Sequence, residues 1–174
     1  QASLVGTTTQ ATLSLSPASG TYQIGQTFSV DININTNGQD VNAIAAYFNF
    51  NTSLFAVDTI NTTGSAFPVE WESTINSSAG TIRIGRSIAG NVNSANAKIA
   101  TLTLRGLTGT APSSDNFTFY FTAGDANTSA AFSGAGAYIL SGVYNGKYTV
   151  TSASADTQAP SVTAVTIPLT SNSL

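Results

Sequence analysis

Strict alternation of apolar and polar residues between Thr27 and Thr36 constrains the fold more than any other feature of this sequence. The apolar residues are spaced two apart, and polar residues fall between them. Successive side chains of a β-strand point to opposite sides, so this pattern predicts a strand with one buried and one solvated face. The predicted buried face carries Phe28, Val30, Ile32 and Ile34.

Similar runs recur along the chain, and segments rich in Gly, Asn and Ser separate them. Strands at this spacing predict an all-β fold, a two-sheet antiparallel β-sandwich of about nine strands in which each sheet buries one face. Asn145-Gly146 fits either a tight hairpin turn or the interior of one continuous last strand. The predicted strands are Thr12–Ser16, Thr27–Thr36, Val41–Phe50, Leu54–Ile60, Val69–Ile75, Thr81–Arg86, Ile99–Leu107, Asn116–Phe121, Tyr138–Leu140 and Val143–Val150.

The composition agrees with many short strands and limits the classes of partner. Only 7% of the 174 residues are charged, and Thr, Ser and Asn supply most of the polarity. The net charge of −3 and the scattered basic residues argue against a nucleic-acid partner. No apolar run approaches the roughly 20 residues of a spanning helix, so we expect no membrane insertion. The chain begins with Gln1, and we expect that a leader or upstream sequence has been removed.

The residue types exclude the commonest forms of catalysis. The chain has no His and no Cys, which excludes Ser-His-Asp and Cys-His catalysis and metal sites built on thiolate or imidazole. Glu70 and Glu72 are expected to share a strand face. A glycosidase needs two carboxyl groups ~5–10 Å apart across a sugar, usually from different elements. We therefore expect these two to be solvated surface or a contact for a basic partner, and expect neither an enzyme nor a cofactor.

Two further motifs have both a functional and a structural interpretation. Asp125–Ser129 alternates oxygen-bearing side chains as the start of a calcium loop does, but it lacks the later Gly and Glu of an EF-hand, and an Asx-rich turn explains it equally well. Trp71 is the only tryptophan, and alternation places it with Val69 and Ile75. This predicts a core position for Trp71 rather than a stacking platform for sugars.

The sequence also contains Asn-X-Ser/Thr sequons, the acceptor motif for N-linked glycans. In a chain this rich in Asn, Ser and Thr, many arise by chance, so they give only a hypothesis of glycosylation. The sequons begin at Asn51, Asn61, Asn76, Asn116 and Asn127.

Four stretches of the chain carry a family resemblance: "LSLSPASGTYQIGQTFSVDININTNGQDVNAIAAYFNFNTSLFAVDTIN", "AGTIRIGRS", "IATLTLRG" and "GKYTV". They resemble the cohesin modules of bacterial surface and cellulosomal scaffold proteins. The resemblance covers roughly Ala11 to Val150 and implies a nine-stranded jelly-roll sandwich that acts extracellularly or at the cell surface as a protein association module. At the corner where the family often has Tyr-Asp-Pro, this chain has Phe50-Asn51-Thr52.

The segment Asn51-Thr52-Ser53 is predicted to be a corner between two strands. Phe50 and Leu54 flank it as core anchors, and the Asn and Ser side chains can satisfy the turning backbone.

The resemblance also implies a binding face. Cohesins typically bind a dockerin through one sheet face, where outward polar side chains of the third strand do much of the hydrogen bonding. That strand maps to Val41–Phe50, and two of its outward positions are alanines that offer no side-chain hydrogen bond. A dockerin-like interaction would therefore depend on the other outward residues. The predicted partner-binding residues are Ala43, Ala45, Tyr47, Asn49, Arg83 and Tyr120.

The ends of the chain are predicted to differ from the sandwich. Residues 1–10 form an N-terminal extension, residues 11–152 the cohesin-like sandwich, and residues 153–161 a linker. Residues 162–174 form a C-terminal strand that either starts a following domain or is donated to a neighbour. The tail "DTQAPSVTAVTIP" resembles the junction into a bacterial Ig-like domain.

These observations lead to two function hypotheses of different class. The first is a non-catalytic extracellular association module whose protein partner is dockerin-like or a second copy. Its more specific version is a filament or surface-layer subunit that uses terminal-strand pairing. The alternative is a carbohydrate-binding module in which Tyr47, Trp71 and Tyr120 stack on sugars.

Overall fold

The computed structural model describes residues 10–152, and these residues form an all-β domain. They contain no helix that could span a bilayer. The predicted linker 153–161, the C-terminal strand 162–174 and all of the N-terminal extension except Gln10 lie outside the described residues. The strands are β1 (Ala11–Ser16), β2 (Ser19–Gln23), β3 (Thr27–Asn35), β4 (Val41–Phe50), β5 (Phe55–Asn61), β6 (Val69–Asn76), β7 (Thr81–Val92), β8 (Ala97–Gly106), β9 (Phe117–Phe119), β10 (Ala130–Ser133), β11 (Leu140–Tyr144) and β12 (Lys147–Thr151).

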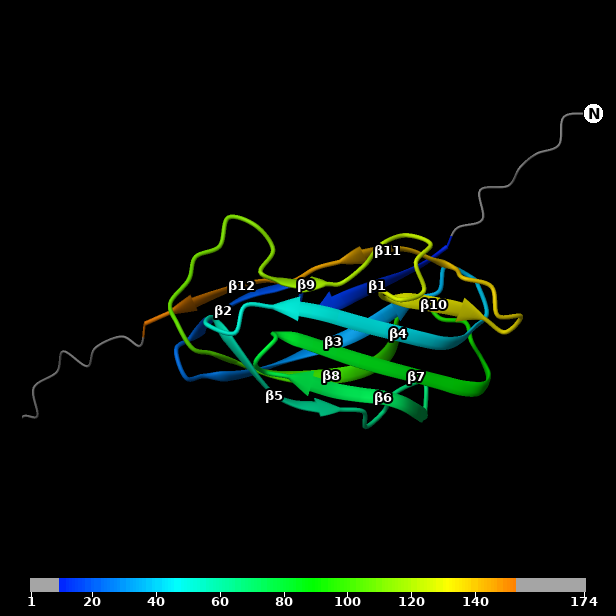
Figure 1. Ribbon diagram of the computed structural model, residues 1–174, viewed down its shortest axis with the longest axis horizontal. Helices are drawn as coiled ribbons and strands as arrows, with labels where there is room; N and C mark the ends of the chain where they lie inside the picture. Colours follow the sequence, from blue (N-terminus) through cyan, green and yellow to red (C-terminus); the bar gives the residue numbers. More distant parts are fainter. Residues whose placement is uncertain (1–9, 153–174) are drawn as a thin grey trace, which may run out of the picture.

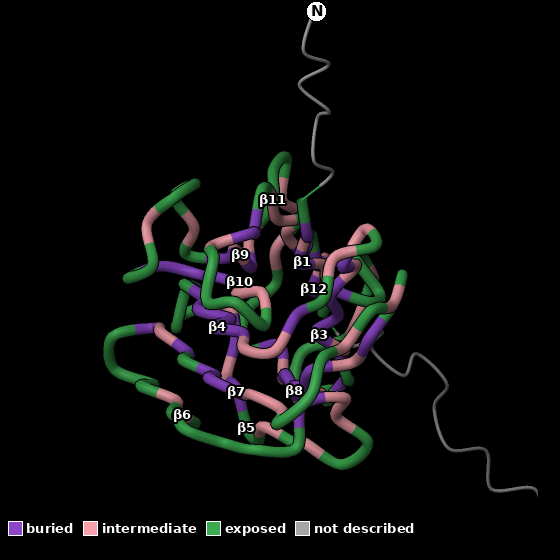
Figure 2. The backbone as a smooth tube through the Cα atoms, turned by 90° about the vertical axis from the view of Figure 1, so that its right-hand side faces the viewer, coloured by how far each residue is buried: buried purple, intermediate pink, exposed green. Residues whose placement is uncertain are grey.

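Two five-stranded sheets pack face to face, which confirms the predicted β-sandwich. One sheet has the order β11-β1-β3-β8-β5, and the other has the order β10-β4-β7-β6 with β9 also paired to β4. Figure 1 shows the strands of both sheets running along the long axis, and Figure 2 shows the buried residues between the two layers. Most inward positions predicted by alternation are filled as expected, but Val69 and Trp71 of β6 are exposed. Fully buried core side chains include Leu13, Ile32, Ile34, Ile44, Phe48, Phe55, Ile82, Ile84, Ile99, Phe117 and Tyr148.

The structure has more strands than the roughly nine that the sequence predicts. The main reason is that the first and the last strand are each interrupted. β1 is followed by a cis Ser16-Pro17 bond and then by β2, while β11 is followed by Asn145-Gly146 and then by β12. β11 pairs with β1, and β12 pairs with β2, in both cases in parallel. Asn145-Gly146 therefore lies within one interrupted last strand and is not a hairpin turn. The other strand pairs are antiparallel.

One side of the sandwich is closed by backbone pairing between the sheets. β9 pairs with β4 on one side and bridges Gly146 through Phe117 on the other. Just before β9, the Asn116 side chain takes the place of a strand residue beside β12. Its Nδ2 donates to the Tyr148 carbonyl at 2.8 Å, and its Oδ1 accepts from the Tyr148 amide at 2.9 Å.

On the opposite side, β5 and β6 end their sheets as edge strands. Each contains an irregularity in its pairing, in β5 between Val57 and Thr59 and in β6 between Glu70 and Glu72. Bulges of this kind twist an edge and hinder unintended pairing with another chain.

The predicted corner at Asn51-Thr52-Ser53 is confirmed by its hydrogen bonds. The Asn51 side-chain Oδ1 accepts from the Ser53 amide at 2.8 Å, and the Asn51 carbonyl accepts from the amides of Leu54 and Phe55 at 3.0 Å. Phe50 is buried, and Leu54 packs against the core. The polar residues therefore satisfy the turning backbone while their apolar neighbours anchor both strands.

Candidate partner-binding face

The outer face of the β10-β4-β7-β6 sheet brings the predicted partner-binding residues together. In the register of β4 and β7, Ala45 lies opposite Gly85 and Tyr47 lies opposite Arg83. Tyr120 directly follows β9, and its amide donates to the Tyr47 carbonyl at 2.8 Å. The remaining predicted residues are Ala43 and Asn49, which are spaced two apart from Ala45 and Tyr47 and so share their face of β4. We call this surface the aromatic face.

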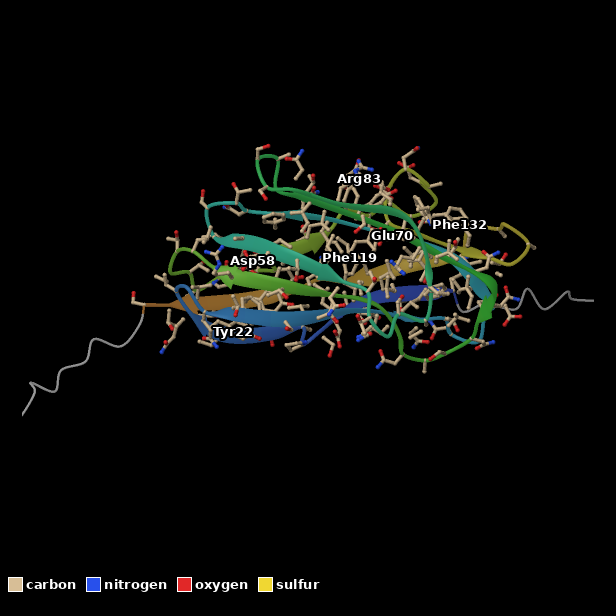
Figure 3. All side chains as sticks on the ribbon, turned by 90° about the horizontal axis from the view of Figure 1, so that it is seen from below. Tyr22, Asp58, Glu70, Arg83, Phe119 and Phe132 are labelled. Atoms are coloured by element: carbon tan, nitrogen blue, oxygen red, sulfur yellow. The ribbon has the colours of Figure 1, made fainter. Side chains whose placement is uncertain are left out.

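The predicted residues differ in how much surface they offer. Ala45 is 2% exposed because it packs in a small cluster with Ala130, covered by Phe132 and Tyr138. Figure 3 shows Phe132 and Arg83 toward the outside of the molecule and Phe119 between the sheets. Ala45 therefore has almost no atoms available to a partner.

Tyr47 is held between a cation and a carboxylate. It is 8% exposed, its hydroxyl donates to Glu72 Oε2 at 2.7 Å, and the Arg83 guanidinium lies 4.6 Å from the centre of its ring. Burial raises the pKa of Tyr47, and the hydrogen bond to Glu72 raises it further. The arrangement fixes Arg83 and Glu72 at the surface of the aromatic face.

Trp71 also belongs to this face, and its predicted core position is wrong. The side chain is 52% exposed. Its indole lies directly over Gly85, where an added Cβ would be 2.5 Å from ring atoms of Trp71. The pairing of β6 with β7 shifts between Glu70 and Glu72, so Trp71 is the extra residue of a bulge. A bulge interrupts the alternation of side chains, and here it turns Trp71 outward.

The same bulge separates the two glutamates that alternation places on one face. Glu70 lies opposite Arg86 in the register, and Glu72 lies opposite Gly85. Arg86 is 4% exposed, and it donates through Nη1 to Glu70 at 3.0 Å and through Nε to the Phe67 carbonyl at 2.7 Å. Glu70 is therefore the partner of a buried cation, while Glu72 orders Tyr47, and the predicted shared face of the two is wrong.

Asp125–Ser129 folds as an Asx turn. Asp125 Oδ1 accepts from the Asn127 amide at 2.9 Å and from Asn127 Nδ2 at 3.0 Å. The Asp125 carbonyl accepts from the Thr128 hydroxyl at 2.9 Å. Across residues 10–152, no group of three or more Asp or Glu side chains converges as metal ligands would.

No family model matches the sequence, and no curated protein is significantly similar to it. Solved structures are similar in fold. The cohesin CaCohA2 from Clostridium acetobutylicum is 21% identical with a TM-score of 0.59, covering 82% of this chain and 91% of that one. The chain has a cohesin-like fold. The resemblance expected from the sequence is thereby confirmed for the fold.

Two other similar structures extend the comparison. A non-cellulosomal cohesin from Archaeoglobus fulgidus is 14% identical with a TM-score of 0.58, covering 82% of this chain and 92% of that chain. The third cohesin of ScaC from Acetivibrio cellulolyticus, solved in complex with the ScaB dockerin, is 15% identical with a TM-score of 0.61, covering 80% and 98%. At these identities, the similarity describes the fold.

Proposed function

We propose that this chain is a non-catalytic protein association module that acts outside the cell or at the cell surface. The observation that best supports this proposal is the aromatic face, where Trp71, Arg83 and Tyr120 are exposed together on one sheet. Trp, Tyr and Arg are the residue types that most often dominate the binding energy of protein interfaces. The similar cohesin of Acetivibrio cellulolyticus, solved with a bound dockerin, supports an association role.

The geometry of the face also favours binding because its side chains are held in place. Trp71 rests on Gly85, and Arg83 rests on the Tyr47 ring. Side chains that are already ordered lose less entropy when a partner binds. The salt bridges of residues 10–152 use Arg86 and Arg105 rather than Arg83. The proposed partner therefore presents an apolar surface for Trp71 with an acidic group for Arg83.

The alanines of β4 set this proposed interface apart from one based on polar β4 side chains. Ala43 and Ala45 offer no side-chain hydrogen bonds, and Ala45 is covered. Recognition therefore depends on the aromatic residues around them. The partner is either a dockerin-like protein or a second copy of this chain. In the second case, residues 162–174 of one copy are proposed to add a strand to the next, as in a filament or surface layer.

A pull-down from the secreted and surface proteins of the source organism tests the proposal, with the purified chain as bait. Bound proteins are compared between wild type and the double variant Trp71→Ala/Arg83→Ala. Size-exclusion chromatography with light scattering measures self-association in parallel. A specific partner, or self-association, that the double variant loses would support the proposal. A chain that stays monomeric and captures nothing specific would contradict it.

Carbohydrate binding is the second candidate, and the position of Trp71 favours it. One side of the indole packs on Gly85 while the side chain remains 52% exposed, which provides a flat stacking surface. Glu72 and Arg83 offer hydrogen-bonding groups on the same face. Because Trp71 is the only tryptophan, its fluorescence reports directly on any sugar that stacks there. Titration with a panel of glycans that leaves this fluorescence unchanged would remove the candidate.

A further inference from the structure

The Asn-X-Ser/Thr sequons differ in what the nitrogen of the Asn side chain does. In three of them, at Asn51, Asn61 and Asn76, the residue is exposed and its Oδ1 accepts a hydrogen bond from a backbone amide further along the turn. Within residues 10–152, Nδ2 of these three residues donates no hydrogen bond. The backbone donors to Oδ1 are Ser53 at 2.8 Å, Thr63 at 2.9 Å and Ala79 at 3.0 Å, and the exposed Ser78 hydroxyl also donates to Asn76 Oδ1 at 2.8 Å.

In the other two sequons, the side-chain nitrogen of the Asn donates a hydrogen bond within the fold. Asn116 Nδ2 donates to the Tyr148 carbonyl at 2.8 Å, and the next residue, Phe117, is fully buried. Asn127 Nδ2 donates to Asp125 Oδ1 at 3.0 Å. The hydroxyl of its sequon belongs to the buried Ser129, which donates to the Tyr47 carbonyl at 3.1 Å. The side chains of these two sequons therefore make hydrogen bonds that belong to the fold.

We propose that Asn51, Asn61 and Asn76 are acceptors of N-linked glycans, whereas Asn116 and Asn127 are not. In this reaction the Asn Nδ2 forms a bond to C1 of a sugar carried by a lipid-linked oligosaccharide donor. The bond between C1 and the donor's phosphate oxygen breaks, the lipid phosphate leaves, and Nδ2 gives up one proton. The inference rests on the proposed extracellular location, since the folded chain must meet the transferase outside the cytoplasm.

The local geometry makes the three sites good acceptors. Each side-chain oxygen is tied to the backbone of its own turn, which leaves the nitrogen without an internal partner. An attached glycan therefore breaks no hydrogen bond of the fold. At Asn116 it would remove the pairing with Tyr148 that covers β12.

Two of the sites, Asn51 and Asn76, lie at the end of the sheet that carries the aromatic face, and Asn61 ends β5 of the other sheet. Asn51 follows β4 and Asn76 ends β6 at the same end of the sheet, because the Phe50 amide donates to the Gly80 carbonyl at 2.8 Å and Asn76 pairs with Thr81. Asn76 is roughly 17 Å along β6 from Trp71, at ~3.4 Å per residue. Glycans on these two residues are attached at the edge of the face, away from Trp71. They also add polar surface to a chain in which only 7% of residues are charged.

Peptide mapping by mass spectrometry of the chain purified from its native source tests the proposal. We expect glycan masses on the peptides that contain Asn51, Asn61 and Asn76, and unmodified peptides at Asn116 and Asn127. Unmodified peptides at all three predicted acceptors would overturn the inference. A glycan at Asn116 would overturn the geometric rule on which it depends.

Sequon variants expressed in the source organism sharpen the test. Thr63→Ala removes the sequon hydroxyl but keeps the backbone amide that donates to Asn61, so we expect it to lose one glycan while the fold is unchanged. Thr62→Ala, within the same sequon, is the control and should keep the glycan. Equal glycosylation of the two variants would contradict the inference. Partner binding by unglycosylated chain, measured separately, tests the proposed function independently of this result.

Discussion

Trp71 lies across Gly85, so close that a methyl group on the glycine would stand 2.5 Å from the Cδ2, Cε2 and Cε3 atoms of the indole. The contact joins neighbouring strands β6 and β7 on the aromatic face. It requires a residue without a side chain on β7 and a bulge on β6, and together these two features place an aromatic ring flat on the surface of the sheet.

Gly85→Ala should displace the indole. We expect a loss of about 1–3 kcal/mol in the free energy of unfolding, as for other overpacked sites, together with a red shift of tryptophan fluorescence as the ring moves into water. Denaturant unfolding followed by fluorescence measures both. Gly90→Ala is the matched control in the same strand, because a Cβ there meets nothing within 4 Å. Equal stability and equal spectra for the two variants would show that the contact is not formed.

Arg86 should contribute more to stability than any other cation tested in the same way. Arg86→Met removes the hydrogen bonds that Arg86 donates to the Phe67 and Pro68 carbonyls and to Glu70, and we expect a loss of about 2–4 kcal/mol. Arg105→Met is the control, since Arg105 pairs with Asp58 at the surface and water replaces that partner readily. Chemical denaturation of both variants checks the prediction, which a larger loss for Arg105→Met would refute.

Stability should fall at alkaline pH because of buried tyrosines. Burial raises the pKa of Tyr47, Tyr138 and Tyr148 above the ordinary value of 10.0. Their contribution is fully present below pH ~10 and is lost as pH rises, because the unfolded chain then releases protons that the folded chain retains. Urea unfolding at about pH 8 and about pH 11 measures the loss.

Tyr148→Phe isolates the largest of these contributions. The variant loses the hydrogen bond from the Tyr148 hydroxyl to the Pro17 carbonyl, so it is less stable at neutral pH, but it should lose less stability between neutral and alkaline pH than wild type. Tyr144→Phe is the control because it removes the same hydroxyl group from an exposed tyrosine. A Tyr148→Phe variant with the same alkaline loss as Tyr144→Phe would count against this assignment.

The fold could be predicted because long alternating runs determine which face of a strand is buried. The run at Thr27–Thr36 became β3, Thr27–Asn35, with Phe28, Val30, Ile32 and Ile34 inward as expected. Short or interrupted strands were harder. β10 is too short to show an alternating pattern. β2 begins within Ser16–Gly20, whose Ser, Pro and Gly residues are typical of a turn.

The positions of the candidate site residues, though not their role, can be compared with the prediction, and the differences have physical causes. Alternation turns Tyr47 and Arg83 outward on their own strands, and the cohesin resemblance implied that both lie on the binding face. The register of β4 and β7 brings them opposite each other. Alternation cannot show that Phe132 and Tyr138, from another part of the chain, cover Ala45. It also fails at Trp71, since a single bulge reverses the expected direction of the side chain and no residue type marks that bulge.

The central claim is that the aromatic face binds the partner, and a dissociation constant measures it most directly. The captured partner, or the chain itself if it self-associates, is titrated against wild type, Trp71→Ala/Arg83→Ala and the control Tyr144→Ala/Arg105→Ala. The control removes an exposed aromatic residue and an arginine from strands of the other sheet. Thermal unfolding first verifies that all three are folded. We expect the face variant to bind at least about tenfold more weakly, as loss of a hot spot of ~1.4 kcal/mol or more implies, and the control to bind like wild type. Equal affinity for wild type and the face variant would contradict the account.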